Sequence, residues 1–287
     1  MRPFRSVLYL PASNARALEK ARSLAVDALI LDLEDAVAPD EKPAARIQLQ
    51  GAISAGGFGN RYLIVRINGL DTQWGADDID AIGATSPDAI LLPKVDGPEQ
   101  IAELAARMDK HPALKTTTIW AMMETPLGIL NAAQTARAPR LEGLVMGTND
   151  LAKDLGASFT PDRLAMQHAL GQCLLTARAN GLVIVDGVYN QYKDVDGLRE
   201  ECDQGLILGM DGKTLIHPAQ VATANEVFAP SAEALEEAHV FVTAFDEAIA
   251  AGQAVAVVNG RIVENLHVEA AKRLIAKAEA ITAMETT

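Results

Sequence analysis

Short apolar runs rich in β-branched and aliphatic residues alternate along the chain with longer stretches of Ala, Leu, Glu, Lys and Arg that have helical spacing. Such runs are typical of buried strands, and stretches with a 3.6-residue period are typical of amphipathic helices. The pattern predicts a strand followed by a helix, with eight strands in all. The predicted strands cover residues 6–11, 28–35, 62–68, 89–95, 118–125, 143–150, 183–189 and 213–218.

Eight such strands separated by helices predict an α/β fold of the (β/α)8 class, a TIM barrel. An open doubly wound sheet more often has about five or six strands and a G-x-G-x-x-G turn after the first strand, and that turn is absent from this sequence. Nearly every predicted strand ends in a polar, charged, Pro or Gly residue. In a barrel these ends converge on one mouth, where the fold places its chemistry. A single charged strand end could be an ordinary loop residue, because loops commonly carry charge. The repetition of polar ends on nearly every predicted strand favours a functional site.

Beyond the eighth strand the chain continues for some seventy residues. Residues 219–250 have helical spacing, residues 253–265 (QAVAVVNGRIVEN) are typical of a hairpin, and a last helix is expected from about His267. We therefore expect a barrel domain over residues 1–225 and a C-terminal helical extension over residues 226–287. This extension would be a lid over the mouth or an arm that packs on a neighbouring subunit.

The chain carries 25 Lys and Arg against 38 Asp and Glu, a formal charge of −13. This excess disfavours nucleic acid and anionic membranes as partners, whereas a small acidic metabolite can still bind to a local basic cluster. The two cysteines, Cys173 and Cys202, lack metal-ligand spacing and do not form a disulfide framework. With no targeting segment in the N-terminal sequence, a cytoplasmic location is expected.

Glu124 and Asp150 end consecutive predicted strands, the fifth and the sixth. Neighbouring strand ends of a barrel can bring two carboxylates to one hard cation, and Mg²⁺ needs only one or two protein carboxylates. We predict that these two residues bind Mg²⁺, or alternatively Mn²⁺. The competing interpretation is that each residue caps a helix, since a helix-like segment follows both.

Three more acids and one arginine belong to the same predicted mouth. Glu34 and Asp35 are expected to contact metal-bound water, and Asp32 should point into the barrel, where it needs a cation. Arg66 is the candidate cation for a carboxylate or thioester oxygen of a ligand, because its guanidinium stays charged and can form two parallel hydrogen bonds. An ion pair of Arg66 with Asp32 or Glu34 is the alternative, and both can hold together.

Four basic residues near the first two strands repeat a spacing of four: Arg16 with Lys20, and Lys42 with Arg46. Two basic helix faces beside the mouth could hold phosphates of a nucleotide-like cofactor, although solvated helix faces have the same spacing. His217 lies before Pro218 at the last strand end, where a capping or nucleotide-contact role is favoured over a catalytic base. No nucleophile elbow is present, which disfavours covalent catalysis.

Ordered segments along the whole chain are similar to one family. They are FRSVLYLPAS, LILDLEDAVAPDEK, VRING, LLPKV, METPLGILN, VMGTNDLAKDLG, VDGVYN, GMDGKTLIHPAQ, NEVFAPS and NGRIVEN. The chain resembles the citrate lyase β-subunit-like enzymes of the HpcH/HpaI aldolase superfamily, which include malyl-CoA and citramalyl-CoA lyases and (3S)-malyl-CoA thioesterases. Within it, the segments WAMMET, MGTNDLAK and GRIVENLH are most similar to the thioesterase branch.

The resemblance implies a role for each matching residue. Glu124 and Asp150 match the magnesium ligands, Glu34 and Asp35 match the acids that bind the metal's waters, Arg66 matches the arginine at the substrate oxygens, and Gly147 with Thr148 matches the turn beside the metal. The coenzyme A thioester is implied to lie against Tyr9, Arg16, Lys20, Lys42, Arg46, Ile216, His217 and Pro218. The family forms trimers or hexamers in which one subunit's C-terminal segment closes over its neighbour's site, so a homotrimer or hexamer is expected.

At one position the chain departs from the lyases of the family. Where they carry an aspartate that acts as the acid/base for the C–C bond, this chain has Glu264. The longer side chain would move the carboxylate away from the α-carbon and toward water. We therefore expect hydrolysis of malyl-CoA to malate and CoA. The alternatives are cleavage of the C–C bond to an acyl-CoA and a 2-oxoacid, or a citrate lyase β-type subunit that works in a larger complex.

Overall fold

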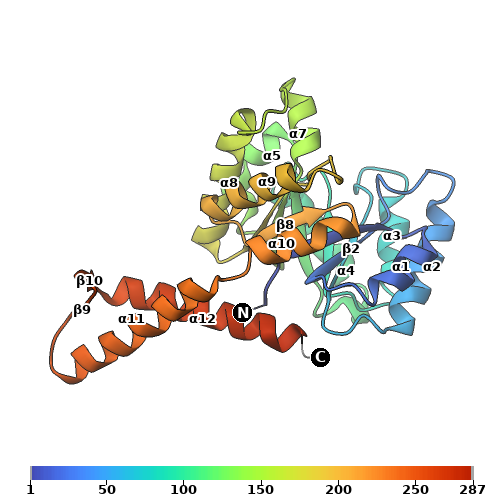
Figure 1. Ribbon diagram of the computed structural model, residues 1–287. Helices are drawn as coiled ribbons and strands as arrows, with labels where there is room; N and C mark the ends of the chain where they lie inside the picture. The colour runs from blue at the N-terminus through green and yellow to red at the C-terminus, as the bar shows by residue number, and fades with distance from the viewer. Residues whose placement is uncertain (1, 286–287) are drawn as a thin grey trace. The chain divides into compact units, whose positions relative to one another are not determined.

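A computed structural model describes residues 2–285, which form two compact units, one of Phe4–Glu226 and one that contains the C-terminal segment from Val227. The first unit is a closed barrel of eight parallel strands in chain order, with β8 paired to β1 (Figure 1). The predicted TIM barrel is confirmed. The strands are β1 (Ser6–Pro11), β2 (Ala28–Asp32), β3 (Tyr62–Arg66), β4 (Ala89–Leu92), β5 (Thr118–Met123), β6 (Leu141–Met146), β7 (Val183–Asp186) and β8 (Gly212–Leu215).

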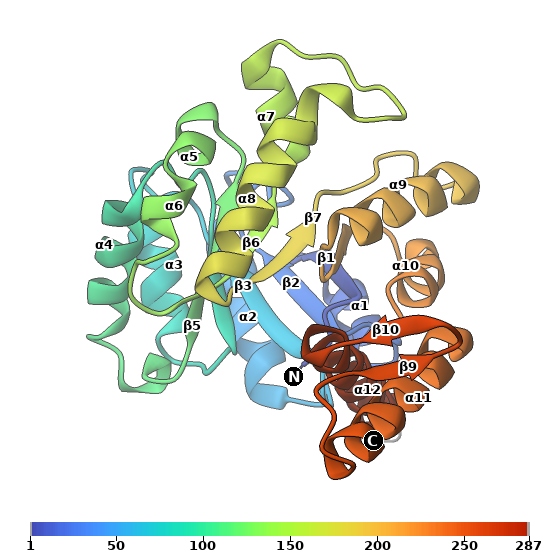
Figure 2. The same cartoon turned by 90° about the vertical axis from the view of Figure 1, so that its left-hand side faces the viewer.

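Helices lie around the outside of these strands, as Figure 2 shows for α3 to α9. They are α1 (Ala15–Ala21), α2 (Lys42–Ala55), α3 (Gly75–Ile82), α4 (Pro98–Met108), α5 (Pro126–Leu130), α6 (Ala132–Thr135), α7 (Thr148–Leu155), α8 (Gln167–Asn180), α9 (Val195–Leu208) and α10 (Val221–Val227). Short 3-10 turns cover Pro112–Leu114, Leu164–Met166 and Pro218–Gln220. Cys173 on α8 and Cys202 on α9 are free, fully buried thiols.

Alternate residues along the strands fill the barrel interior. Ile30 on β2, Ile64 on β3 and Met122 on β5 belong to one buried cluster. Because successive side chains of a strand point to opposite faces, the residues two positions further along face the same interior. Those residues are Asp32, Arg66 and Glu124. The hydrophobic pattern of the strands therefore directs three charged side chains to the carboxyl end of the barrel.

At the opposite end, the barrel is closed by aromatic rings. Phe4 packs edge-on against Tyr62 and Trp120, with ring centroids 5.2 and 5.1 Å apart. The carboxylate of Glu142 accepts hydrogen bonds from the Tyr62 hydroxyl and, at 3.1 Å, from Trp120 Nε1. Gly143 lies directly against this tryptophan, since a Cβ atom there would be 2.5 Å from the indole ring.

Gly143→Ala is therefore expected to lower the free energy of unfolding by about 1–3 kcal/mol, the usual cost of overpacking a core. Gly51→Ala and Gly171→Ala are matched controls, because a Cβ at either helical position meets no atom within 4 Å. Removing a helical glycine at an open position should stabilise by about 0.5–1 kcal/mol. Urea unfolding followed by circular dichroism measures all three. A Gly143 variant as stable as wild type would contradict this packing.

Several predicted boundaries differ from the structure. Most strands end two to four residues earlier than predicted, because the polar residues that follow already leave the sheet to form loops or helix starts. The helix predicted over residues 219–250 is interrupted at 228–231. Pro230 cannot continue a helix, and Ser231 begins the next one by accepting a hydrogen bond from Ala234 N at 3.1 Å.

The second unit consists of two long helices joined by a hairpin. Its elements are α11 (Ala232–Ala250), β9 (Ala256–Val258), β10 (Arg261–Val263) and α12 (Asn265–Glu285). The hairpin turns at Asn259 and Gly260, whose φ angles of 50° and 76° suit a tight two-residue turn. The strands pack with α11 around a small core that includes Phe245, Val258 and Val263. Within residues 2–285, none of the helices has the length and apolar character needed to cross a bilayer.

Candidate active site

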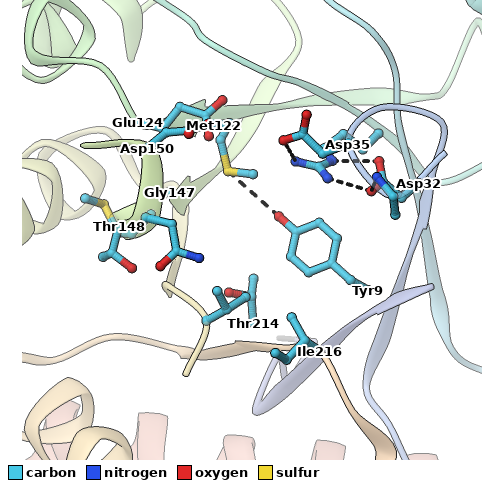
Figure 3. Close-up of a pocket in the computed structure, with 15 residues that line it drawn as sticks. Tyr9, Asp32, Asp35, Met122, Glu124, Gly147, Thr148, Asp150, Thr214 and Ile216 are labelled. Atoms are coloured by element: carbon cyan, nitrogen blue, oxygen red, sulfur yellow. Dashed lines mark hydrogen bonds and ion pairs between the residues drawn. The ribbon is translucent and has the colours of Figure 1, made fainter. Parts of the chain in front are cut away.

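The carboxyl ends of the strands surround a cavity of about 460 Å³ (Figure 3). Its walls combine acidic residues with an arginine and a few apolar side chains. They are Tyr9, Asp32, Asp35, Ala36, Arg66, Met122, Glu124, Met146, Gly147, Thr148, Asn149, Asp150, Val188, Thr214 and Ile216. The barrel thus brings together most of the acids and the arginine predicted for the mouth.

Arg66 is held by two carboxylates. Its Nε and Nη2 donate to both oxygens of Asp32 at 2.7 and 2.5 Å, and its Nη1 lies 2.7 Å from Glu34 Oε2. The ion pair that we considered as the alternative for Arg66 is therefore present with both acids. Arg66 also lines the cavity, and a guanidinium has five N–H groups. Donors of Arg66 remain for a ligand after Asp32 and Glu34 are satisfied.

Glu34 is incompletely compensated in this pair. The side chain is buried, and among residues 2–285 its Oε2 has no aligned hydrogen-bond donor although it lies in the ion pair with Arg66. Burial, opposed by Arg66 and assisted by the neighbouring Asp35 and Asp32 charges, raises the pKa of Glu34 to about 7. Asp35 is exposed and lines the cavity.

Glu124 follows β5 and is oriented by its neighbours. Its Oε1 accepts the backbone N–H of Lys94 at 2.8 Å, which leaves Oε2 available. Gly147 makes room for this carboxylate, because a Cβ at that position would lie 2.6 Å from Glu124 Oε2. Burial raises the pKa of Glu124 to about 7, and the charges of Glu34 and Asp150 contribute to the shift.

Asp150 is not at a strand end, which corrects our prediction. Strand β6 stops at Met146, Gly147 caps the next element, and Asp150 lies in the first turn of α7. The helix begins directly after the strand because the polar segment from Thr148 supplies residues suited to a first turn, where an aspartate also complements the helix dipole. Neither acid is the N-cap of its helix: Gly147 precedes α7, and the Thr125 side chain caps α5 by accepting from Gly128 N.

Magnesium fits this donor set. Glu124 and Asp150 line the same cavity, offer only hard oxygen donors, and are close enough for the Asp150 charge to act on Glu124. Within residues 2–285 no three His, Cys, Asp or Glu side chains are grouped as a complete metal site. Two protein carboxylates are sufficient for Mg²⁺, since this ion keeps several waters and binds substrate oxygens.

The raised pKa values of Glu34 and Glu124, both about 7, predict a pH-dependent response to Mg²⁺. Without metal, the folded protein binds more protons than the unfolded chain between pH 4.5 and 7, because the two carboxyl groups stay protonated longer when folded. The free energy of unfolding therefore falls as pH rises through this window. Each of the two groups contributes at most about 1.4 kcal/mol per pH unit to this fall. Mg²⁺ needs the charged carboxylates, so its binding strengthens over the same window. We expect the increase in Tm caused by Mg²⁺ to be larger at pH 8 than at pH 5.5; equal increases would contradict the assignment.

The residues assigned to coenzyme A by resemblance occupy different environments. Tyr9 and Ile216 line the cavity, with the Tyr9 ring 5.0 Å from the Arg66 guanidinium. His217 is exposed, caps the turn at Pro218 by accepting Ala219 N at 3.1 Å, and stacks on Tyr192 with a centroid distance of 4.5 Å. The geometry of His217 is that of a cap.

The four basic residues do not form two open faces. Arg16 and Lys20 on α1 are exposed. Lys42 and Arg46 on α2 are buried instead, and their donors are used inside the chain. Lys42 Nζ donates to the backbone oxygens of Leu33 and Glu34 at 2.9 and 2.8 Å, and Arg46 Nε donates to Asp78 at 2.7 Å. The predicted basic face on α2 is therefore wrong, because its inner side meets the acid of α3 and the loop after β2.

Glu264 belongs to the second unit, between β10 and α12, and is exposed. Its backbone N–H donates to His267 Nδ1 at 3.0 Å.

Two features near the cavity were not predicted to be functional. Lys94 follows β4 with a left-handed φ of 49°, and its N–H binds the Glu124 carboxylate. Asn149 and Asn190 exchange two amide hydrogen bonds of 3.1 and 2.8 Å, which join the first turn of α7 to the loop after β7. The only sequence signal for the role of Lys94 is a lysine at the predicted strand end in LLPKV. Nothing in the spacing of residues indicates the contact between Asn149 and Asn190.

The closed barrel and the acidic cavity at the carboxyl ends of its strands place the chain in the class of (β/α)8-barrel enzymes. Residues 5–218 match the family described as HpcH/HpaI aldolase/citrate lyase. The chain belongs to this family.

Curated relatives of two kinds match almost the full chain. A (3S)-malyl-CoA thioesterase of Cereibacter sphaeroides is 56% identical over 285 residues, covering 99% of this chain and 98% of its own. An L-malyl-CoA/beta-methylmalyl-CoA lyase of the same organism is 34% identical, covering 98% and 96%. The chain is thus considerably more similar to the thioesterase than to the lyase.

Solved structures of the family have the same fold. The CitE protein of Mycobacterium tuberculosis, in complex with magnesium, acetoacetate and coenzyme A, is 30% identical and superposes with a TM-score of 0.80 over 97% of this chain and 100% of its own. A citrate lyase beta subunit from the same organism, complexed with oxaloacetate and magnesium, is 32% identical with a TM-score of 0.69 over 79% of this chain and 98% of its own.

Proposed function

We propose that this protein hydrolyses (3S)-malyl-CoA to malate and coenzyme A. The observation that carries the proposal is the 56% identity with (3S)-malyl-CoA thioesterases over 99% of the chain, against 34% with the lyase. The acidic cavity with one arginine suits a hydroxy acid thioester that binds through a divalent cation.

Glu124 and Asp150 would hold Mg²⁺, or alternatively Mn²⁺, which supplies a Lewis acid for the hydroxyl and carboxylate oxygens of the malyl group. The CitE structure with magnesium and coenzyme A supports this assignment by similarity. Glu34 and Asp35 are proposed to orient water in the same cavity. In this arrangement the negative charge of these four acids, which Arg66 compensates only in part, would be balanced by the bound cation.

Arg66 is proposed to stabilise the thioester oxygen as it gains negative charge. Asp32 and Glu34 hold the guanidinium in place, so its remaining N–H groups are preorganised for that oxygen. Glu264 is proposed to take a proton from the attacking water. The water oxygen then forms a bond to the carbonyl carbon, the C–S bond breaks, and the thiolate of coenzyme A receives the proton.

For coenzyme A itself, we propose contacts with Tyr9 and Ile216, which line the cavity, with His217 and Pro218 in the turn after β8, and with the exposed Arg16 and Lys20. Lys42 would act indirectly, through the loop after β2 that it holds, and Arg46 would act indirectly through its contact with Asp78 on α3. We further propose a homotrimer or hexamer in the cytoplasm, in which Glu264 is supplied by a neighbouring copy. The free thiols of Cys173 and Cys202 are consistent with a reducing compartment.

The test is product identification. Purified protein is incubated with (3S)-malyl-CoA and Mg²⁺, and the products are separated by chromatography. Malate and free coenzyme A support hydrolysis. Glyoxylate and acetyl-CoA would overturn it in favour of the lyase, which the 34% identity keeps as the second candidate. Strict dependence on a co-purifying protein would instead indicate a subunit of a larger complex.

Glu264→Gln is expected to lower kcat by at least about 100-fold, since a positioned general base contributes about 10²–10⁴-fold. The increase in Tm caused by Mg²⁺ should stay the same, because Glu264 is not among the proposed metal ligands. Glu269→Gln, at an exposed position of α12, is the control. Full activity of the Glu264 variant would remove this residue from the mechanism.

A further inference from the structure

Glu124 and Asp150, the two proposed metal ligands, are held in different ways. The carboxylate of Glu124 accepts the backbone N–H of Lys94 at 2.8 Å. In the described part of the chain, residues 2–285, no hydrogen bond or ion pair holds the carboxylate of Asp150. The position of this carboxylate therefore depends on its own backbone, which belongs to the first turn of α7. Contacts that fix this turn also fix the ligand.

The loop after β7 is a well-anchored support beside this turn. The carbonyl of Gly187 accepts a hydrogen bond from Lys213 Nζ at 2.6 Å. The carbonyl of Tyr189 accepts one from Gln220 Nε2 at 2.9 Å. Lys213 and Gln220 are both fully buried, and Lys213 also pairs with the buried Asp186 at 3.1 Å. Because buried polar groups with satisfied hydrogen bonds make a structure rigid, the loop backbone is fixed on the inner side.

Two contacts join this loop to the first turn of α7. Asn149 Nδ2 donates to Asn190 Oδ1 at 3.1 Å, and Asn190 Nδ2 donates back to Asn149 Oδ1 at 2.8 Å. Gly187 packs against Thr148 so closely that a Cβ atom at Gly187 would lie 2.4 Å from Thr148 Oγ1. Thr148 and Asn149 directly precede Asp150, and all three line the main cavity (Figure 3). Asn190 lines a neighbouring cavity, so its effect on the metal site would pass through α7.

We propose that Asn190 is a positioning residue of the metal site. Through Asn149 it holds the first turn of α7, so that Asp150 and Glu124 meet at one cation. This inference rests on the proposed function, because it concerns the metal site that the same reaction would use. Two reciprocal hydrogen bonds fix the direction of both amides as well as their distance. Loss of a partner that orients a metal ligand commonly weakens metal binding by about 10–100-fold.

The test is a double-mutant cycle of Asn149→Ala, Asn190→Ala and the variant with both substitutions. Calorimetry measures the Kd for Mg²⁺ of each protein. Hydrogen exchange of the metal-free proteins, followed by mass spectrometry, measures the local order of residues 147–151. Asn180→Ala is the matched control, because Asn180 is exposed and donates within its own helix, α8, to the Thr176 carbonyl at 2.9 Å.

Each single variant of the cycle is expected to bind Mg²⁺ about tenfold more weakly than wild type. The double variant should also lose about tenfold rather than about 100-fold, because residues that act as one pair are not additive. Hydrogen exchange of residues 147–151 should become faster in all three, whereas exchange in the barrel strands should stay as in wild type. The Asn180 variant should match wild type in both measurements.

Turnover adds a readout that a general loss of stability would not change. Asn190→Ala should need more Mg²⁺ for its half-maximal rate and should reach the kcat of wild type when Mg²⁺ is saturating. Wild-type Mg²⁺ binding by Asn190→Ala would overturn the proposal, and so would additive losses in the double variant. Faster exchange throughout the barrel would overturn it as well, because Asn190 would then support the fold in general.

The outcome is separable from that of the proposed function. If wild type binds Mg²⁺ but leaves malyl-CoA intact, and Asn190→Ala binds Mg²⁺ more weakly, hydrolysis is wrong and the role of Asn190 stands. If wild type hydrolyses malyl-CoA and Asn190→Ala binds Mg²⁺ as wild type does, the role of Asn190 is wrong and hydrolysis stands.

Discussion

Asp150→Asn is expected to lower turnover of malyl-CoA by about 1,000-fold while the protein stays folded. The neutral amide is a poor ligand for Mg²⁺, and Glu124 alone cannot replace the lost charge. Without metal, the stability of the variant should be within about 1 kcal/mol of wild type, because the substitution removes a charge that repels Glu124 but also the favourable interaction of Asp150 with the α7 dipole. At Mg²⁺ concentrations about 100 times the wild-type Kd, the stabilisation of about 2.7 kcal/mol expected for wild type should disappear in the variant.

Asp154→Asn is the matched control for this experiment. Asp154 lies on the same helix, α7, but is exposed and does not line the cavity. It should retain turnover and the full response to Mg²⁺. If Asp150→Asn remained active, or if a chelator left the wild-type activity unchanged, the metal assignment would be wrong.

Arg66→Met is expected to affect stability and activity together. The substitution leaves Asp32 buried without its cation and Glu34 without its ion pair, and breaking a buried pair in this way costs about 3–5 kcal/mol. Turnover should fall by at least about 100-fold, since the donor proposed for the thioester oxygen is lost. Chemical unfolding and steady-state kinetics measure the two effects.

Arg107→Met separates these effects from the general loss of an arginine. Arg107 pairs with Glu103 on the surface of α4, where an ion pair contributes less than about 1 kcal/mol. The control should therefore be close to wild type in both assays. An Arg66 variant with wild-type stability would show that Asp32 and Glu34 do not depend on this guanidinium.

The barrel and the presence of charged residues at its mouth were predictable because both follow from local periodicity. The alternation along the second and third strands indicated that Asp32 faces inward and needs a cation, and the structure pairs it with Arg66 on the neighbouring strand. The polar residues that follow the fifth and sixth strands likewise include Glu124 and Asp150, and both line one cavity although Asp150 lies on α7.

What could not be predicted depends on contacts between distant segments. Lys42 and Arg46 have the spacing of a basic helix face, but only the tertiary structure shows that Asp78 of α3 and the loop after β2 occupy their donors. The left-handed backbone of Lys94 donates its N–H to Glu124, which lies on the next strand unit and 30 residues further along the chain. The position of Asp150 on a helix depended on where β6 ends, and boundaries of elements are the least certain part of any pattern.

The burial of both cysteines has a practical consequence for measuring thiol release. Burial raises the pKa of Cys173 and of Cys202 to about 12, so neither forms an appreciable amount of thiolate near neutral pH. A chromogenic disulfide reagent added to the native enzyme should therefore report coenzyme A as it is set free, with little background from the protein. The same reagent should detect two additional thiols per chain once the fold is lost, so one colour reaction can follow both catalysis and unfolding.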